Sequence, residues 1–353
     1  GHEGEGSLLA LLKTRSWANS LSAGLGYSDE NQAMFEISIS LSDKGAEQIE
    51  EIGRLLFAYI ELVRERGVER FYHEELRQRA EQDFRYQEKI SESDLVQRLA
   101  ARLHRYQADE VLSAPYLIEN FKPERVRHIL EQMQVDRLQL IITDPQLQSA
   151  QKTGWYDVAY EAQKIDPAWL RAWKQPGSEE ALSLPVPNPF IAQQLELLPL
   201  ETDAELPQEL DTSLPVQLWH QTELGFGQPK AELYFTLRST AANASARERL
   251  LTELYVIAVR EALNTYSYPA LLAGLQYRIY PHSRGLSVRI SGYAEKQVQL
   301  LETIIDGMMN LEIDPQRFDL YLENVKQGLE NSLKGRPSAR VVDGVYDLLL
   351  TSN

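Results

Sequence analysis

The histidines and acidic residues of the chain approach two zinc-binding patterns and complete neither. A His-Glu-x-x-His helix places two imidazoles on one metal ion, with the glutamate positioned to activate water. His2-Glu3 fails this pattern because Gly6 occupies the position of the second histidine, and His73-Glu74 fails at Arg77. The inverted pattern, His-x-x-Glu-His, fits as far as Glu5 and then meets Gly6 again. The sequence therefore predicts no catalytic residue and no metal site in this chain.

Other catalytic and nucleotide-binding patterns are also incomplete. Gly24-Leu-Gly26 and Gly225-Phe-Gly227 each lack the third glycine of a dinucleotide-binding loop, and no phosphate-binding Gly-Lys-Ser/Thr occurs. The chain has no cysteine, which excludes disulfides, thiolate zinc sites and cysteine nucleophiles. Adjacent carboxylates such as Glu50-Glu51 are interpreted as the solvated faces of helices. The remaining histidines are isolated and are interpreted as surface or packing residues: His104, His128, His220 and His282.

The segment from Trp17 to Tyr27 alternates in the manner of a β-strand. One predicted face carries Trp17, Leu21, Ala23, Leu25 and Tyr27, and the other carries only small residues: Ala18, Ser20, Ser22, Gly24 and Gly26. A strand that lacks large side chains on one face lets another backbone approach closely. Two interpretations stay open: the strand packs tightly beneath a helix, or its edge accepts an extended peptide as an additional strand.

Length and charge limit the class of protein. The 353 residues predict two or slightly more domains, and a hydrophobic content of 43% predicts folded cores. The net charge of −16 disfavours nucleic acid and anionic membrane surfaces as partners. No apolar run is long enough to span a membrane. The sequence starts without Met and runs at once into Leu8-Leu9, so we expect it to be a piece of a longer chain.

Proline spacing divides the chain into two parts. Seven of the 16 prolines fall within residues 176–215 and predict an extended, mobile connector without a helix. These are Pro176, Pro185, Pro187, Pro189, Pro199, Pro207 and Pro215. Before the connector, alternation over Phe35–Leu41 predicts a strand, and apolar residues at helical spacing predict a helix from Ile49 to about Gly67. A later strand is predicted at Leu138–Ile142.

The same order of elements recurs after the connector, which indicates an internal duplication. Ile37, Ile39 and Leu41 match Leu286, Val288 and Ile290 at an offset of 249 positions. The helical stripe Ile52, Leu55, Leu56 and Tyr59 matches Leu301, Ile304, Ile305 and Met308 at the same offset. Glu69-Arg-Phe71 and Gln316-Arg-Phe318 then each open a further helix. The predicted fold class is α+β, with two homologous domains in which helices pack on mixed or antiparallel sheets.

Short motifs spread along nearly the whole chain form a recognisable set. They start with His2-Glu-Gly-Glu-Gly-Ser-Leu-Leu9 and continue with Asn188-Pro-Phe-Ile191 in the connector. They include Leu218-Trp219, Leu272-Ala-Gly-Leu275, and the stretch from Gly292-Tyr293 to Lys296-Gln297. Together these motifs resemble those of the insulinase/pitrilysin zinc metallopeptidases. The resemblance implies a clamshell of four homologous α+β domains, two in each half, with a connector between the halves.

The resemblance implies a place for each part of the chain. Residues 1–175 would be most of the second domain, 176–215 the connector between halves, and 216–353 the front part of the third domain. The family's zinc is in the first domain, so the parent protein would hold zinc and this chain would hold none. Peptide substrates and the first and fourth domains of the same parent would be its partners.

The resemblance also implies a substrate-anchoring exosite in the second domain. Carried over by position, its residues are Gly1, Glu3, Leu21, Ala23 and Leu25. Ala23 and Leu25 replace the family's Gly and Gln, so main-chain pairing with a peptide would survive and a side-chain amide contact would not. Glu3 could pair with the terminal ammonium of a substrate.

The function predicted from these features is a non-catalytic segment of a peptide-degrading zinc metalloendopeptidase. It would supply chamber wall, hinge and exosite, and the isolated chain would be inactive. The alternative is a structural or interaction subunit of the same fold without protease activity. By resemblance, the location would be periplasmic if the source is bacterial, with the cytoplasm as the alternative.

Overall fold

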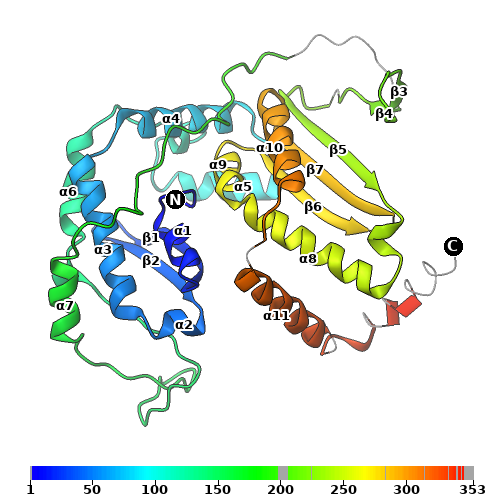
Figure 1. Ribbon diagram of the computed structural model, residues 1–353. Helices are drawn as coiled ribbons and strands as arrows, with labels where there is room; N and C mark the ends of the chain where they lie inside the picture. Colours follow the sequence, from blue (N-terminus) through cyan, green and yellow to red (C-terminus); the bar gives the residue numbers. More distant parts are fainter. Residues whose placement is uncertain are drawn as a thin grey trace. The chain divides into compact units, whose positions relative to one another are not determined.

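The computed structural model describes residues 2–197, 206–223, 225–282, 284–313, 315–332, 334–338, 341–342 and 344–345. The chain divides into two compact units (Figure 1). Unit 1 comprises Gly1–Glu81 and Glu92–Pro187, and unit 2 comprises Gln82–Ser91 and Asn188–Asn353. Both units combine helices with antiparallel strands, which confirms the α+β fold class. The assignment of residues to particular domains of the family stays a prediction.

A two-stranded hairpin and a long helix form the centre of unit 1. Strands β1 (Ala18–Ser28) and β2 (Ala33–Leu41) are antiparallel, and β2 confirms the strand predicted at Phe35–Leu41. Helix α3 (Ile49–Arg66) ends at Gly67, whose φ of +77° suits glycine. Apolar side chains from the hairpin and from two helices, α1 (Leu8–Thr14) and α3, form one core of the unit.

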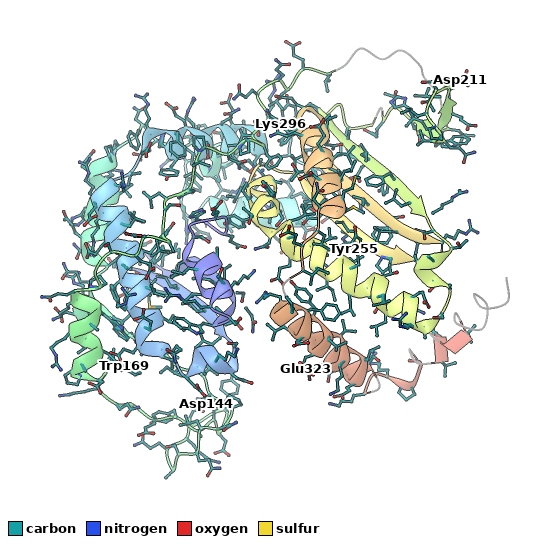
Figure 2. The ribbon with its side chains drawn as sticks, in the orientation of Figure 1. Asp144, Trp169, Asp211, Tyr255, Lys296 and Glu323 are labelled. Carbon is teal, nitrogen blue, oxygen red and sulfur yellow. The ribbon has the colours of Figure 1, made fainter. Side chains whose placement is uncertain are left out.

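Helix α7 (Pro167–Lys174) packs against α3 and forms a second, smaller core of unit 1. Trp173 on α7 packs there against Phe57 and Ile60 of α3, and its indole nitrogen donates a 2.7 Å hydrogen bond to the main-chain oxygen of Glu50. Trp169 of the same helix lies at the edge of this core (Figure 2). The helices have these bounds: α2 Asp43–Ala46, α4 Arg70–Arg85, α5 Glu92–Arg102, α6 Pro123–Gln132 and α7 Pro167–Lys174.

The prediction of a strand at Leu138–Ile142 is wrong. These residues contain no strand, and Ile141 is 76% exposed. A β-strand needs a neighbouring strand to satisfy its main-chain hydrogen bonds, and no described strand lies beside this segment. Only Leu138 packs against the core around Trp173.

Unit 2 is built on a three-stranded antiparallel sheet in the order β5-β7-β6. The strands are β5 (Lys230–Arg238), β6 (Gln276–His282) and β7 (Gly285–Tyr293). Leu286, Val288 and Ile290 of β7 are almost wholly buried, as their alternation predicts, and face the core formed with α8 and α10. A separate short hairpin pairs β3 (Gln208–Leu210) with β4 (Leu218–His220).

Two helices cover the apolar face of this sheet. They are α8 (Ala246–Ala262) and α10 (Gln297–Met309), and Tyr255 of α8 donates a 2.7 Å hydrogen bond to the main-chain oxygen of Met308 (Figure 2). The stripe predicted on α10 is correct for Ile304, which is wholly buried, whereas Ile305 is 40% exposed. Unit 2 also contains α9 (Asn264–Leu272) and α11 (Pro315–Ser332).

The described part of the proline-rich stretch is extended and contains no helix, yet it isn't a free linker. Phe190 is 2% exposed and Ala192 is fully buried, and Phe190 and Ile191 belong to the core of unit 2. Asn188 holds this turn in place, because its side-chain nitrogen donates to the oxygen of Pro269 at 2.8 Å. Composition alone predicted an extended, mobile connector because prolines exclude regular structure, but they do not prevent a neighbouring aromatic ring from packing.

The order of elements agrees with the predicted duplication. In unit 1 the hairpin β1-β2 precedes α3 and α4, and in unit 2 the hairpin β6-β7 precedes α10 and α11. In each hairpin the two strands are antiparallel neighbours. Strand β6 of unit 2 therefore occupies the position in the sequence order that β1 occupies in unit 1.

Candidate peptide-docking edge

Strand β1 carries the candidate docking residues, and two bulges modify the predicted faces. The pairing shifts between Ala18 and Ser20 and again between Leu25 and Tyr27. Each bulge adds one residue, so the side chains beyond it change faces. Ala18 is consequently buried in the core with Leu21 rather than lying on the face of small residues, which corrects the sequence prediction at both ends of the strand.

Between the bulges the predicted alternation holds. Leu21 pairs with Ile39, Ala23 with Ile37 and Leu25 with Phe35, so these candidate residues share one face with side chains of β2. Leu21 is half-buried against the core, whereas Leu25 is 65% exposed. The sequence identified β2 as a strand but could not give its register, and so it missed these β2 side chains as neighbours of the candidate residues.

The outer edge of β1 has no strand beside it among the described residues. Within the described part of the chain this sheet contains β1 and β2 only, and β2 occupies one edge of β1. No other main-chain hydrogen bond from residues 19–27 is found within the described ranges. An unpaired edge exposes main-chain N–H and C=O groups, which are the groups that an added strand binds.

The face of small residues is open rather than closely covered. A Cβ atom built on Gly24 would meet no atom within 4 Å, and Ser20 and Ser22 are exposed. Tight packing beneath a helix would place atoms close to this glycine. Ala18 and Leu21 of β1 do pack in the core with α1 and α3, but among the described residues no helix closely covers the face of small residues around Gly24.

Glu3 lies near the start of the chain, in a segment held by its neighbours. His2 Nδ1 lies 3.0 Å from the hydroxyl oxygen of Tyr59 on α3, and burial lowers the pKa of His2. Burial also raises the pKa of Tyr59 to about 12. Glu3 itself is half-buried and makes no hydrogen bond or ion pair with another described residue. Gly1, the remaining candidate residue, lies outside the described residues.

The described residues do not fit a zinc site. No group of three His, Asp or Glu side chains among them is arranged to hold a metal ion. The two histidines of the incomplete motifs have other neighbours: His2 bonds Tyr59, and His73 Nε2 lies 2.5 Å from the main-chain oxygen of Glu119. No reaction step is therefore assigned to a metal held by these residues.

Comparison with known proteins identifies the family. The sequence profile described as the middle or third domain of peptidase M16 matches residues 84–353. The chain belongs to the peptidase M16 family. This result confirms the resemblance to the insulinase/pitrilysin group that the motifs indicate.

Relatives within the family match almost the whole chain. The insulin-degrading enzyme-like 1, peroxisomal, of Arabidopsis thaliana is 32% identical over 94% of this chain. The insulin-degrading enzyme of Homo sapiens is 30% identical over 96% of it. The fold is similar to the crystal structure of pitrilysin, with a TM-score of 0.76, 24% sequence identity and 95% of this chain covered.

The M16 chain described here spans about a third of the length of these relatives. It covers 34% of the Arabidopsis protein, 33% of the human protein and 36% of the pitrilysin chain. It corresponds to the middle-domain region of the family, and its described helices include none long and apolar enough to cross a membrane.

Proposed function

We propose that this chain anchors extended peptides at the outer edge of β1, within a zinc metalloendopeptidase that degrades peptides. The supporting observation is that the outer edge of β1 has no strand beside it among the described residues, and that Ala23 and Leu25 of this strand are exposed. Each main-chain hydrogen bond to an added strand contributes about 0.5–1.5 kcal/mol net of water. A few such bonds orient a substrate without holding it tightly.

The proposal assigns residues 1–175 to the second domain of the family, 176–215 to the connector and 216–353 to the third domain. Zinc and the catalytic residues would belong to the first domain of the same parent, and peptides would be the substrates. Chamber wall, hinge and anchoring are then the contributions of this chain. Family membership and the middle-domain match support this division of roles. The compartment, periplasmic or cytoplasmic, stays a prediction.

Two groups would contact the peptide in different ways. The main chain around Ala23 would pair with the main chain of the peptide, since Ala23 has no side chain that reaches a ligand. Glu3 would bind the terminal ammonium of the peptide, since its carboxylate has no hydrogen-bond or ion-pair partner among the described residues. Gly1, the remaining residue of the predicted exosite, lies outside the described residues.

The test uses the longer protein that carries these residues together with its catalytic domain. Ala23→Pro removes one main-chain N–H and fixes φ, whereas the control Ala23→Ser keeps the strand backbone. We expect Ala23→Pro to raise KM for long peptides that reach both the zinc and β1, and to spare short peptides that reach only the zinc. Equal losses for both would assign Ala23 to folding, and no change for either would refute docking at β1. A parent without peptidase activity would favour the structural-subunit alternative.

A further inference from the structure

The polar face of the unit 2 sheet carries two arginines directly opposite each other. Arg278 of β6 pairs in register with Arg289 of β7, and Arg289 pairs in turn with Tyr234 of β5. Residues paired in an antiparallel sheet share a face and lie close together, and like charges in this arrangement are unfavourable. This row of side chains is therefore a local concentration of positive charge on a chain whose net charge is −16.

Only one of the two arginines is neutralised within the described part of the chain. Arg289 donates to Glu232 at 2.7 Å and stacks over the ring of Tyr234, with 5.4 Å from the guanidinium carbon to the ring centroid. Arg278 is exposed and has no carboxylate partner among the described residues. Within the row of Arg278, Arg289 and Tyr234, the positive charge of Arg278 is therefore not balanced by a described carboxylate.

A cavity of about 400 Å³ lies beside this row and extends around the edge of β6. Arg278 and Tyr280 line it from the polar face of the sheet, and Tyr277 and Ile279 line it from the helix-covered face. Arg260 of α8 contributes a third guanidinium and, like Arg278, has no ion-pair partner among the described residues. A cavity lined from both faces of one strand lies at that strand's outer edge.

The backbone of β6 can accept another strand at this edge. Among the described strands, β6 is the last of the order β5-β7-β6, so only one of its edges is occupied by another described strand. Pro281 has no N–H, and a proline within a sheet sits where that group would point away from the neighbouring strand. Tyr277 and Ile279 have the same parity as Pro281, so their N–H and C=O groups also point outward. These groups make no main-chain hydrogen bond outside the sheet with any described residue.

We propose that the outer edge of β6 is a second docking edge, which binds an extended peptide carrying two adjacent acidic residues. Consecutive side chains of an added strand point to opposite faces. One carboxylate of an adjacent pair would therefore reach Arg278 on the polar face, and the next would reach Arg260 on the other face. Arginine binds carboxylates through paired N–H donors, and the tyrosines would supply further contacts. The analogy with docking at β1 rests on the proposed function, whereas the argument from charge and from the open edge of β6 does not.

The test measures binding of fluorescein-labelled Thr-Val-Glu-Glu-Val-Thr, blocked at its C-terminus, to the 353-residue chain by fluorescence anisotropy. One matched probe replaces both Glu residues by Gln. Two further probes carry N-methyl groups on alternate main-chain nitrogens, one on the odd-numbered residues and the other on the even-numbered residues; these are the two methylation frames. We expect the Gln probe to bind about tenfold more weakly, because it loses charge-assisted hydrogen bonds. One methylation frame should abolish binding and the other should preserve it, because only alternate amides of an added strand face β6.

Protein variants complete the test. Arg278→Gln and Arg260→Gln are each expected to weaken binding of the Glu-Glu probe about fivefold to tenfold. Arg278→Lys should fall between Arg278→Gln and the unchanged chain, because it keeps the charge and loses the paired donors. Arg247→Gln is the matched control, since Arg247 lies at the other end of α8 and its side chain is 80% exposed. Thermal melting checks that each variant is folded.

Three results would overturn the proposal. Binding that is unaffected by Arg278→Gln and Arg260→Gln would place the peptide elsewhere. Equal binding of both methylated frames would show a charged patch without strand addition, and equal binding of the Gln probe would remove the role of the carboxylates. Ala23→Pro, which tests docking at β1, should leave binding of the Glu-Glu probe unchanged. Failure at β1 and failure at β6 are therefore distinguishable.

Discussion

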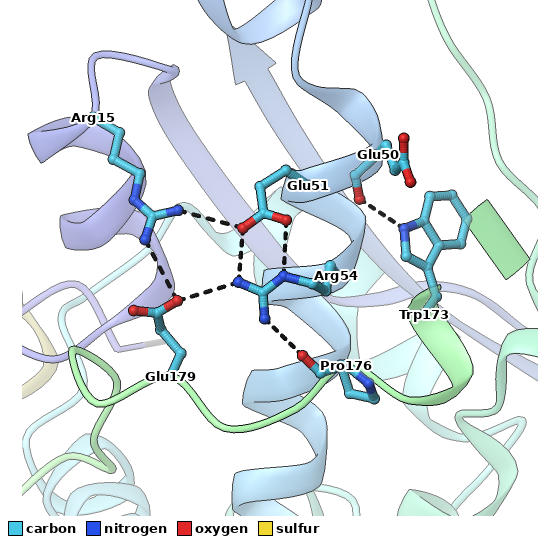
Figure 3. Close-up of polar contacts among 7 residues, drawn as sticks. All are labelled: Arg15, Glu50, Glu51, Arg54, Trp173, Pro176 and Glu179. Atoms are coloured by element: carbon cyan, nitrogen blue, oxygen red, sulfur yellow. Dashed lines mark hydrogen bonds and ion pairs between the residues drawn. The ribbon is translucent and has the colours of Figure 1, made fainter. Parts of the chain in front are cut away.

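Arg54 donates two hydrogen bonds to the carboxylate of Glu51, from Nε at 2.8 Å and from Nη2 at 2.7 Å (Figure 3). The same guanidinium donates to the main-chain oxygen of Pro176 at 2.6 Å and to Glu179 at 3.2 Å. Arg15 approaches both carboxylates, at 3.6 Å from Glu51 and 3.4 Å from Glu179. Helix α3 thus holds the beginning of the proline-rich stretch against unit 1.

Replacing Arg54 should destabilise unit 1. We expect Arg54→Gln to lower the free energy of unfolding of unit 1 by about 1–3 kcal/mol, because the Pro176 oxygen loses its donor and the two carboxylates keep only the longer contacts with Arg15. Arg70→Gln is the control, since its ion pair with Glu74 is 76% exposed on the arginine side and should contribute less than about 1 kcal/mol. Urea unfolding monitored by tryptophan fluorescence measures the difference, because Trp173 is buried in unit 1. Equal losses in the two variants would contradict a structural role for the Arg54 contacts.

The same contacts predict a dependence on pH. Hydrogen bonds from Arg54 hold the pKa of Glu51 below its usual value of 4.5, against the opposing effect of its partial burial. The folded chain then binds this proton less tightly than the unfolded chain does. The stability that Glu51 contributes is therefore present above about pH 4.5 and is lost as the pH falls below that value.

Glu51→Gln tests this linkage because it removes the titrating group and keeps the side-chain length. Between about pH 5.5 and 3.5, unit 1 of the unchanged chain should lose more stability than unit 1 of the variant. Urea unfolding at several pH values gives the free energy of unfolding as a function of pH for the unchanged chain and for the variant. Equal slopes of these two curves would show that Glu51 does not contribute to the acid sensitivity of unit 1.

Two glycines within helices should respond oppositely to alanine. A Cβ on Gly53 of α3 would lie 2.4 Å from Cε2 of Trp173, so Gly53→Ala should destabilise unit 1 by about 1–3 kcal/mol through overpacking. A Cβ on Gly328 of α11 would meet no atom within 4 Å, so Gly328→Ala should stabilise its unit by about 0.4–1 kcal/mol. Chemical unfolding of both variants gives the sign of each change in the free energy of unfolding. A stabilising Gly53→Ala would mean that Trp173 can move aside at little cost.

The proline-rich stretch should contain one residue on which unit 2 depends. Phe190→Ala should lower the stability of unit 2 by about 3–5 kcal/mol, because it empties a fully buried ring position. Val186→Ala, four residues earlier and 79% exposed, should change stability by less than about 0.5 kcal/mol. Thermal unfolding followed by circular dichroism separates the two variants. Similar melting curves for both would show that this stretch is only a linker.

Local patterns in the sequence were sufficient to predict the strands that have one buried face and the helices that are amphipathic. Alternation at Phe35–Leu41 and at Leu286, Val288 and Ile290 predicted β2 and β7, because one side of each strand is apolar. Helical spacing from Ile49 predicted α3, and Gly67 marked its end. The repeated order of these elements predicted the duplication, since each copy keeps the same alternation and helical spacing.

The tertiary structure alone decided features that depend on distant neighbours. Leu138–Ile142 forms no strand because no described strand is available to pair with it, and the bulges in β1 come from its register with β2. The burial of Phe190 depends on a core assembled from residues far along the chain. The opposition of Arg278 and Arg289 depends on strand register, which sequence spacing does not give. Burial and charge balance are properties of assembled surfaces, whereas periodicity is a property of a single segment.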